Sequence, residues 1–155
     1  MNLDVPFSKR LIDVLREDLQ LTGTKIACEV GRCGACMVLI NGKAQNACLT
    51  MTYQCSDKKV VTIEGASELG LDFVQRAFLE EGGFQCGYCT PGMIMSVKSV
   101  LEANPNPTLE QLKDGLTGNL CRCTGYGGII RALKRINEEA IQMTRERGQG
   151  VEGAI

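Results

Sequence analysis

Cysteine is the residue type whose number and spacing in this chain could support chemistry. The sequence has 155 residues, with nine cysteines and no histidine. Eight of the cysteines form two sets of four: the first set is Cys28, Cys33, Cys36 and Cys48, and the second set is Cys86, Cys89, Cys121 and Cys123. Four thiolates can hold a structural zinc ion or an iron–sulfur cluster, and thiols can also pair as disulfides. These are the alternatives that the two sets present.

A disulfide framework does not suit this sequence. The number of cysteines is odd, no export signal opens the chain, and cytosolic thiols are normally kept reduced. Apolar runs such as residues 37–40 are far too short to cross a bilayer. We therefore expect a cytoplasmic protein with free cysteines, of which Cys55, outside both sets, serves as a small packing residue.

The spacing of the first set favours an iron–sulfur cluster over zinc. Cys28, Cys33 and Cys36 follow the Cys-x4-Cys-x2-Cys pattern, with a later fourth cysteine, that is typical of plant-type [2Fe–2S] ferredoxins. Gly31 and Gly34 let this loop curl tightly, so that backbone N–H groups can point at bridging sulfides. Zinc sites commonly pair two Cys-x2-Cys units about 15–20 residues apart, whereas 49 residues separate the two units here. Two clusters are predicted, with zinc as the alternative.

The composition excludes several other functions. Lys and Arg total 17 against 18 Asp and Glu, which argues against a nucleic acid or an anionic membrane as partner. No nucleophile with an orienting base can be assembled, so we expect no acid–base catalysis in this chain. The length allows one ordinary domain or two small ones, and cluster ligation would add stability to two small cores.

Residues 1–65 are predicted to form a small α+β domain of the plant-type ferredoxin-like (β-grasp) kind. We expect a strand at residues 3–5 and a helix over residues 9–18 capped by Ser8. Residues 37–40 and 43–49 should form a hairpin, because Asn41-Gly42 favours the turn that matches strand twist. A further strand is predicted over residues 60–63.

Residues 66–143 are predicted to form a four-helix bundle, followed by a flexible tail at residues 144–155. The expected helices are residues 71–81, a helix capped by Thr90 with Pro91 in its first turn, a short helix opened by the capping box Thr108–Gln111, and residues 127–143. The second set lies where two of these helices begin, and helix N-termini favour anionic thiolates.

Three motifs carry a resemblance to a known family. They are Cys33-Gly-Ala-Cys36, Gln85-Cys-Gly-Tyr-Cys-Thr-Pro-Gly92 and Gly118-Asn-Leu-Cys-Arg-Cys-Thr-Gly-Tyr126. Together they resemble the iron–sulfur subunit of the molybdenum hydroxylases, the family of xanthine dehydrogenase, aldehyde oxidoreductase and carbon monoxide dehydrogenase. The resemblance covers residues 3–142.

The resemblance implies an electron-transfer subunit with one [2Fe–2S] cluster on each set. It implies a large molybdopterin-binding partner, an FAD-binding partner and a dimer of heterotrimers. It places the second set nearest the molybdenum, with Gln85 and Cys123 approaching the pterin, and the first set toward the flavin. Substrate chemistry would take place in the large subunit, so this chain does not identify the substrate. A free-standing two-cluster ferredoxin and a zinc-stabilised interaction module are the alternatives.

Overall fold

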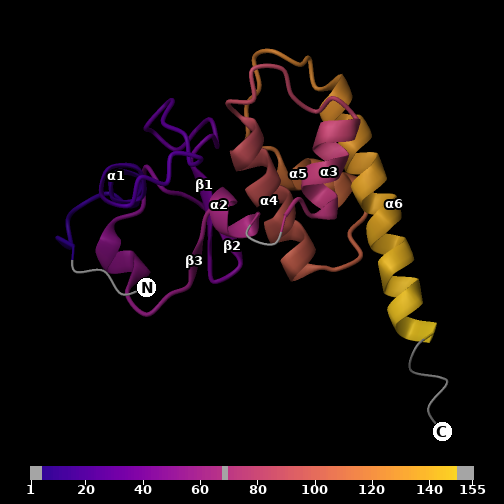
Figure 1. Cartoon of the computed structure of the whole chain (residues 1–155), viewed down its shortest axis with the longest axis horizontal. Coiled ribbons are helices and arrows are strands. Elements are labelled where there is room, and N and C mark those ends of the chain that lie inside the picture. The colour runs from indigo at the N-terminus through magenta and orange to yellow at the C-terminus, as the bar shows by residue number, and fades with distance from the viewer. Residues whose placement is uncertain (1–4, 68–69, 150–155) are drawn as a thin grey trace, which may run out of the picture.

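The computed structural model describes residues 5–67 and 70–149, except for the side chains of residues 147–149. It shows a mixed α and β fold in which a small sheet lies beside a group of helices (Figure 1). Its elements in chain order are α1 (Leu11–Asp13), η1 (Val14–Asp18), β1 (Met37–Ile40), β2 (Lys43–Asn46), η2 (Thr52–Cys55), β3 (Val60–Val61), α2 (Ile63–Ala66), α3 (Phe73–Glu80), α4 (Thr90–Ala103), α5 (Leu109–Gly115) and α6 (Gly127–Gln149).

The sheet confirms the predicted hairpin. Its order is β2-β1-β3, with antiparallel pairing throughout, and Leu39 lies opposite Ala44 across the hairpin. Asn41 and Gly42 both have positive φ, as the expected two-residue turn requires. The second arm ends at Asn46, before the predicted end at residue 49. The last strand is also shorter than predicted, because Ile63 already begins α2.

The N-terminal helix differs from its prediction. It begins at Leu11, after Arg10 in an extended conformation, so Ser8 is not its cap. It continues without a break into the π-helical segment η1. Leu11, Ile12 and Leu15 pack onto the sheet, with Val38 and Ile40 on the opposite side of this small core. The strand predicted at residues 3–5 falls mainly outside the described residues, and Val5 is not in a strand.

Helices α3, α4, α5 and α6 share a second apolar core, whose largest buried residues are Phe78, Met93, Leu112, Ile129, Leu133 and Ile136. The capping box at Thr108 and Gln111 is confirmed, and a second one at Asp72 and Gln75 opens α3. Thr90 is not a cap, because the helix already includes it and Cys89 takes the N-cap position. Helix α6 continues to Gln149, so residues 144–149 of the predicted tail are helical. Residues 150–155 lie outside the described part.

The sheet and the helices are joined through α4. Ser99 on α4 accepts a hydrogen bond from the Ala44 N–H (2.9 Å) and donates one to the Gly42 carbonyl (3.1 Å). Gly92, near the start of α4, allows close approach to the first set, because a Cβ there would lie 2.0 Å from the Gly34 oxygen. No helix within the described ranges is both long and apolar enough to cross a membrane.

Candidate functional site

The hairpin brings two cysteines of the first set together. Cys36 directly precedes β1 and Cys48 follows β2, and the N–H of Ala47 donates to the Cys36 carbonyl at 3.1 Å. Both side chains are buried in the N-terminal core, with 3% and 4% exposure. This burial raises the pKa of the Cys36 thiol to about 12. The Cys48 side chain acts in the same direction, and the backbone N–H of Cys48 acts against it.

The loop of residues 28–36 directs backbone donors at Cys28. Glu29, Gly31 and Gly34 all have positive φ, which turns the loop back on itself. The N–H groups of Val30, Arg32 and Cys33 point at the Cys28 sulfur, and the Arg32 nitrogen lies 3.3 Å from it. These hydrogen bonds, the one from Val30 above all, lower the pKa of Cys28 to about 6. The loop therefore favours the thiolate, which is the form that ligates metal.

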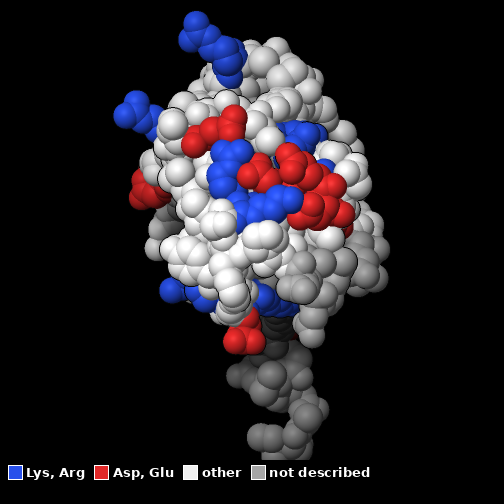
Figure 2. Space-filling view, turned by 90° about the vertical axis from the view of Figure 1, so that its left-hand side faces the viewer, with Lys and Arg blue, Asp and Glu red and all other residues white. Residues whose placement is uncertain are grey.

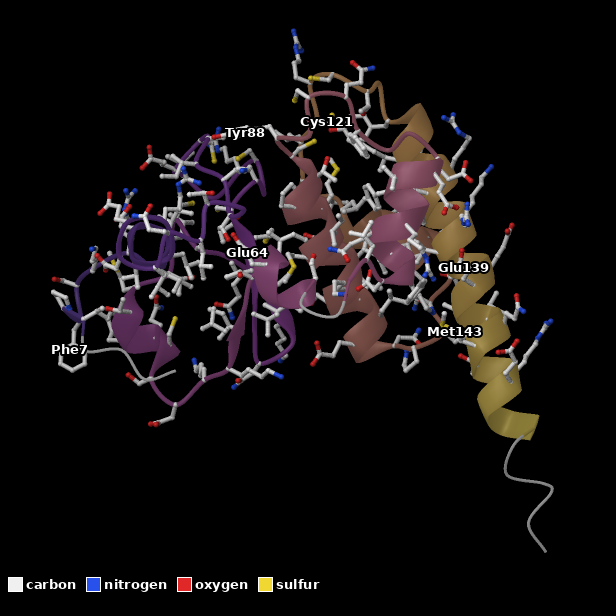
Figure 3. All side chains as sticks on the ribbon, viewed as in Figure 1. Phe7, Glu64, Tyr88, Cys121, Glu139 and Met143 are labelled. Carbon is white, nitrogen blue, oxygen red and sulfur yellow. The ribbon has the colours of Figure 1, made fainter. Side chains whose placement is uncertain are left out.

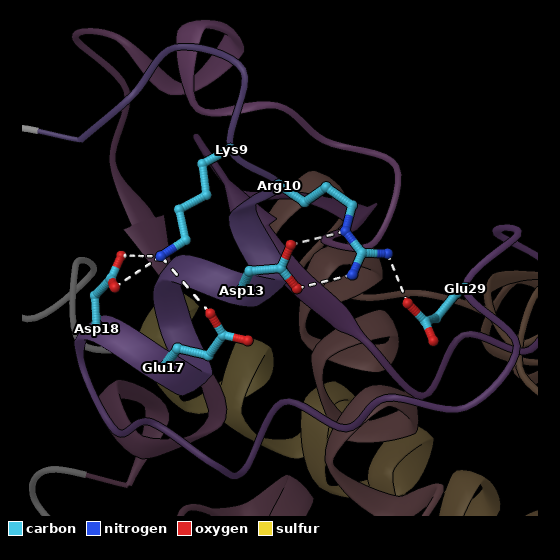
Figure 4. Close-up of polar contacts among 6 residues, drawn as sticks. All are labelled: Lys9, Arg10, Asp13, Glu17, Asp18 and Glu29. Atoms are coloured by element: carbon cyan, nitrogen blue, oxygen red, sulfur yellow. Dashed lines mark hydrogen bonds and ion pairs between the residues drawn. The ribbon is translucent and has the colours of Figure 1, made fainter.

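An ion-pair network fixes this loop to the N-terminal helix (Figure 4). Arg10 donates two hydrogen bonds to Asp13, at 2.8 and 2.9 Å, and one to Glu29 at 2.6 Å. Glu29 follows Cys28 and has a left-handed backbone conformation that is uncommon for a residue with a side chain. Arg10 therefore holds in place the turn that directs the N–H groups at Cys28.

A second group of ion pairs, formed by Lys9, Glu17 and Asp18, lies beside the Arg10 network (Figure 4). Lys9 bonds Asp18 at 2.7 and 2.8 Å and lies 3.7 Å from Glu17. Figure 2 views the molecule from this side, where basic and acidic side chains lie next to one another.

The second set is assembled from two loops that precede helices. Cys86 and Cys89 lie before α4, and Cys121 and Cys123 lie before α6. Cys89 and Cys121 pack against the helical core, whereas Cys86 and Cys123 are exposed, with their sulfurs 3.6 Å apart. Figure 3 shows Cys121 in the loops at the end of the helices, with Tyr88 between these loops and the N-terminal region.

The two inner cysteines of the second set have opposite pKa shifts. Burial raises the pKa of Cys89 to about 12, and the adjacent Cys121 adds to this. Burial acts in the same direction on Cys121, but hydrogen bonds from the Thr124 hydroxyl, at 3.2 Å, and from the N–H groups of Thr124 and Cys123 outweigh it. They lower the pKa of Cys121 to about 7. Hydrogen bonds from the surrounding chain thus favour the thiolate form of one cysteine in each set, Cys28 in the first and Cys121 in the second.

The cysteines of each set lie near one another. The sulfurs of Cys86 and Cys123 are 3.6 Å apart, and the pKa of Cys36 responds to Cys48 and Cys33 and that of Cys89 to Cys121 and Cys86. Four neighbouring thiolates can hold a zinc ion or a [2Fe–2S] cluster. The Cys-x4-Cys-x2-Cys spacing of the first set is typical of the cluster.

Gln85 and Cys55 are the two remaining residues that the sequence analysis singled out. Gln85 is exposed beside Cys86, on the side of the second set that includes Cys123. Cys55 packs at the edge of the N-terminal core, and its pKa is raised by burial with no other cysteine contributing. This placement is consistent with a packing role, which stays a prediction.

Sequence reasoning missed the residues that support the cysteines. Arg10, Thr124 and Asn119 all hydrogen-bond to the cysteine loops or between them. Thr124 and Asn119 lie inside the motifs quoted above, and that position was the signal that could have identified them. No sequence signal identified Arg10, because its partner Glu29 lies far from it along the chain.

Comparison with known proteins gives matches along most of the chain. Two family models match, the 2Fe-2S iron-sulfur cluster binding domain over residues 2–57 and the [2Fe-2S] binding domain over residues 62–134. The chain is 56% identical over 138 residues to a probable xanthine dehydrogenase subunit of Bacillus subtilis (strain 168), covering 89% of this chain and 80% of that one.

Two further matches agree with these. The nicotinate dehydrogenase small FeS subunit of Eubacterium barkeri is 47% identical over 128 residues, which is 82% of either chain. Among solved structures, quinoline 2-oxidoreductase from Pseudomonas putida 86 superposes with a TM-score of 0.80 at 41% identity, covering 89% of this chain and 87% of that chain. Sequence and structure therefore point to the same group of proteins.

Proposed function

Because this chain belongs to the family of iron–sulfur subunits of the molybdenum hydroxylases, we propose that it carries electrons between a molybdenum centre and a flavin in partner subunits. The chain is an oxidoreductase component that binds two [2Fe–2S] clusters. When bound, such a cluster takes up and releases electrons singly at a potential set by its ligands and surroundings. Acid–base catalysis is not part of this role.

We assign one cluster to each set. Cys28, Cys33, Cys36 and Cys48 would hold one in a ferredoxin-like (β-grasp) domain, and Cys86, Cys89, Cys121 and Cys123 the other in a four-helix bundle domain. The observation that carries this assignment is that the fold brings the cysteines of each set together: Cys36 and Cys48 are buried in one core beside the hairpin, and the sulfurs of Cys86 and Cys123 lie 3.6 Å apart. We propose domain bounds of 1–65 and 66–143. The two family models divide the chain close to this boundary, between residues 57 and 62.

The residues around each set shape the two sites differently. The buried Cys36 and Cys48 keep one side of the first site away from water, and the N–H groups at Cys28 stabilise negative charge on the other. In the second site, Cys86 and Cys123 face outward. An exposed pair of ligands gives a partner subunit close access to that site.

The proposed partners follow from this exposure and from the family. A large molybdopterin-binding subunit would cover the second set, with Gln85 and Cys123 toward the pterin, and an FAD-binding subunit would lie nearer the first set. The relatives are named as subunits, which supports a multi-subunit enzyme. We propose that this assembly is a dimer of heterotrimers in the cytoplasm. The substrate belongs to the large subunit and is not assigned.

Analysis of the purified chain tests the cluster assignment. Iron and sulfide in equal amounts, little zinc, a visible absorption spectrum and two [2Fe–2S] signals in electron paramagnetic resonance (EPR) are expected. Zinc without sulfide would contradict the assignment. Co-purification with a molybdenum-containing subunit distinguishes a subunit from a free-standing ferredoxin.

The variant Gln85→Leu tests the proposed route to molybdenum. Leucine keeps the approximate volume but removes the amide that could hydrogen-bond the pterin. Both clusters should still assemble, because no cysteine changes. In the complex, reduction by substrate should slow while reduction by a small chemical donor stays normal, as stopped-flow absorption would show. Equal substrate-driven rates would remove Gln85 from the route.

A further inference from the structure

The two sets of cysteines meet at a hydrogen-bonded contact, which we call the seam. It consists of Cys33 and Gly34 on one side and Asn119 and Leu120 on the other. The N–H of Leu120 donates to the carbonyl of Cys33 at 2.9 Å. Because Leu120 directly precedes Cys121, this bond joins a residue of the first set to the neighbour of a residue of the second set. No side chain intervenes in this connection.

Asn119 holds the seam together from a buried position. Its side chain is 3% exposed, and its Nδ2 donates to the Gly34 carbonyl at 3.1 Å. Its Oδ1 accepts from the Ser96 hydroxyl on α4 at 2.8 Å, and its own N–H donates to the Leu116 carbonyl at 2.9 Å. The buried side-chain amide thus bonds the first loop and helix α4, and the backbone N–H of the same residue bonds the end of α5. Buried amides are costly to leave unsatisfied, so this set of partners defines one position.

The seam also has little room for movement. Gly34 has a left-handed backbone, and a Cβ there would lie 2.4 Å from the Asn119 Nδ2 and 2.5 Å from the Gly118 oxygen. On the other side, the Gly34 oxygen lies against Gly92 of α4. The Gly34 turn is therefore enclosed between Asn119 and α4, and contacts with both of them restrict its position.

We propose that Asn119 is a positioning residue that fixes the separation of the two sets, and that it does so by maintaining the bond between Leu120 and Cys33. This inference rests on the proposed function, because electron passage between two centres weakens steeply as their separation grows. Asn119 touches no cysteine sulfur. It acts through the backbone that carries Cys33 and Cys121.

Hydrogen exchange of the cluster-loaded protein tests the proposal directly. In Asn119→Ala the peptide containing Leu120 should exchange about tenfold faster than in the wild type, because the loss of one net hydrogen bond has roughly this effect on a local opening equilibrium. Peptides from the far end of α6 should be unaffected. Asn106→Ala, at an exposed asparagine before α5, is the matched control and should leave the exchange unchanged.

EPR measures a property that a general loss of stability would leave unchanged, namely the magnetic interaction between the two reduced clusters. With both clusters reduced, the magnetic interaction between them depends on their separation and relative orientation. Asn119→Ala should alter this interaction while iron content and both signals persist. Unchanged exchange at Leu120 together with an unchanged interaction would overturn the proposal. A wild-type chain without two signals would instead contradict the proposed function.

Ser96→Ala keeps the proposal testable if Asn119→Ala fails to fold. It removes a single hydroxyl, leaves the Asn119 amide in place and frees it to move. Faster exchange at Leu120, smaller in extent than for Asn119→Ala, and an altered magnetic interaction are expected. If Ser96→Ala matches the wild type in both measurements, Asn119 does not depend on its α4 anchor and the proposal is wrong.

Discussion

The two cysteine sets each bring four sulfurs into one region but are built in different ways. In the first set, three cysteines lie within one short loop, and the hairpin returns the fourth. In the second set, two loops that are far apart in sequence meet because α4 and α6 pack in one core. The first site therefore depends mainly on local backbone conformation and the second on helix packing. Changes in one region should affect the two sites unequally.

Loss of one ligand should give the largest difference between the sites. Cys48→Ser should abolish the cluster on the first set and retain the other, and Cys123→Ser should do the reverse. Iron content should fall by about half in either variant, because each set holds one cluster. Cys48→Ser should also cost about 1–3 kcal/mol of stability, because it buries a poorly satisfied hydroxyl, whereas the exposed Cys123 adds little beyond cluster loss. Iron analysis, EPR and thermal unfolding measure these effects. Loss of both signals from one substitution would show that the sets are not independent.

A methyl group at Gly92 tests how far the helices control the first site. In Gly92→Ala the Cβ would lie 2.0 Å from the Gly34 oxygen, so backbone must shift at a cost of about 1–3 kcal/mol. The first-set EPR signal should change although Gly92 lies on a helix. Gly65→Ala is the control, because its Cβ would meet only Val61 at 3.6 Å. A lower midpoint of thermal unfolding for Gly65→Ala than for Gly92→Ala would refute the steric account.

Replacement of Arg10 should perturb the first site alone. Arg10→Lys cannot keep both the bidentate bond to Asp13 and the bond to Glu29, so the turn after Cys28 should loosen. We expect a shift in the reduction potential of the first cluster and a stability loss of about 0.5–1 kcal/mol, typical of a partly exposed pair. Arg131→Lys, which alters an ion pair to Glu81 at 3.7 Å on the helical side, is the matched control. Equal potential shifts in both variants would show that the effect is not local.

Glu64 should give the smallest effect, seen only in its pH dependence. Burial acts to raise the pKa of this carboxylate, but hydrogen bonds from Thr62, from its own N–H and from Gly23, together with the charge of Lys25, lower it. Glu64 lies between the sheet and the helices (Figure 3). A lowered pKa contributes stability above the unfolded value of about 4.3, and that contribution is lost as pH falls through the folded pKa.

The comparison with Glu64→Gln isolates this contribution. The wild type should have the higher midpoint of thermal unfolding near neutral pH, and the two midpoints should converge as the pH falls below about 4. Cluster content measured at each pH is the control, because acid can also release iron. A difference that grows toward acid would mean that the Glu64 pKa is raised on folding.

Local features of this fold could be predicted from the sequence because they depend on residues a few positions apart. The Asn41-Gly42 turn and the capping box at Thr108 formed as expected, since each uses hydrogen bonds within four residues. The membership of the two cysteine sets followed from spacing, although their role as ligands stays a prediction. Thr90 was wrongly predicted as a cap, because Ser and Thr suit several positions near a helix start and packing selects one.

Only the tertiary structure decided which groups from distant segments meet. The pairing of Cys86 with Cys123, the bond from Arg10 to Glu29 and the position of Asn119 against Gly34 all join residues far apart in sequence. Such contacts leave no periodic or spacing signal, because they follow from how whole elements pack rather than from local backbone preference. The sequence by itself determined the cysteines available for two metal sites. The packing of α4 beside the hairpin decided how those sites face each other.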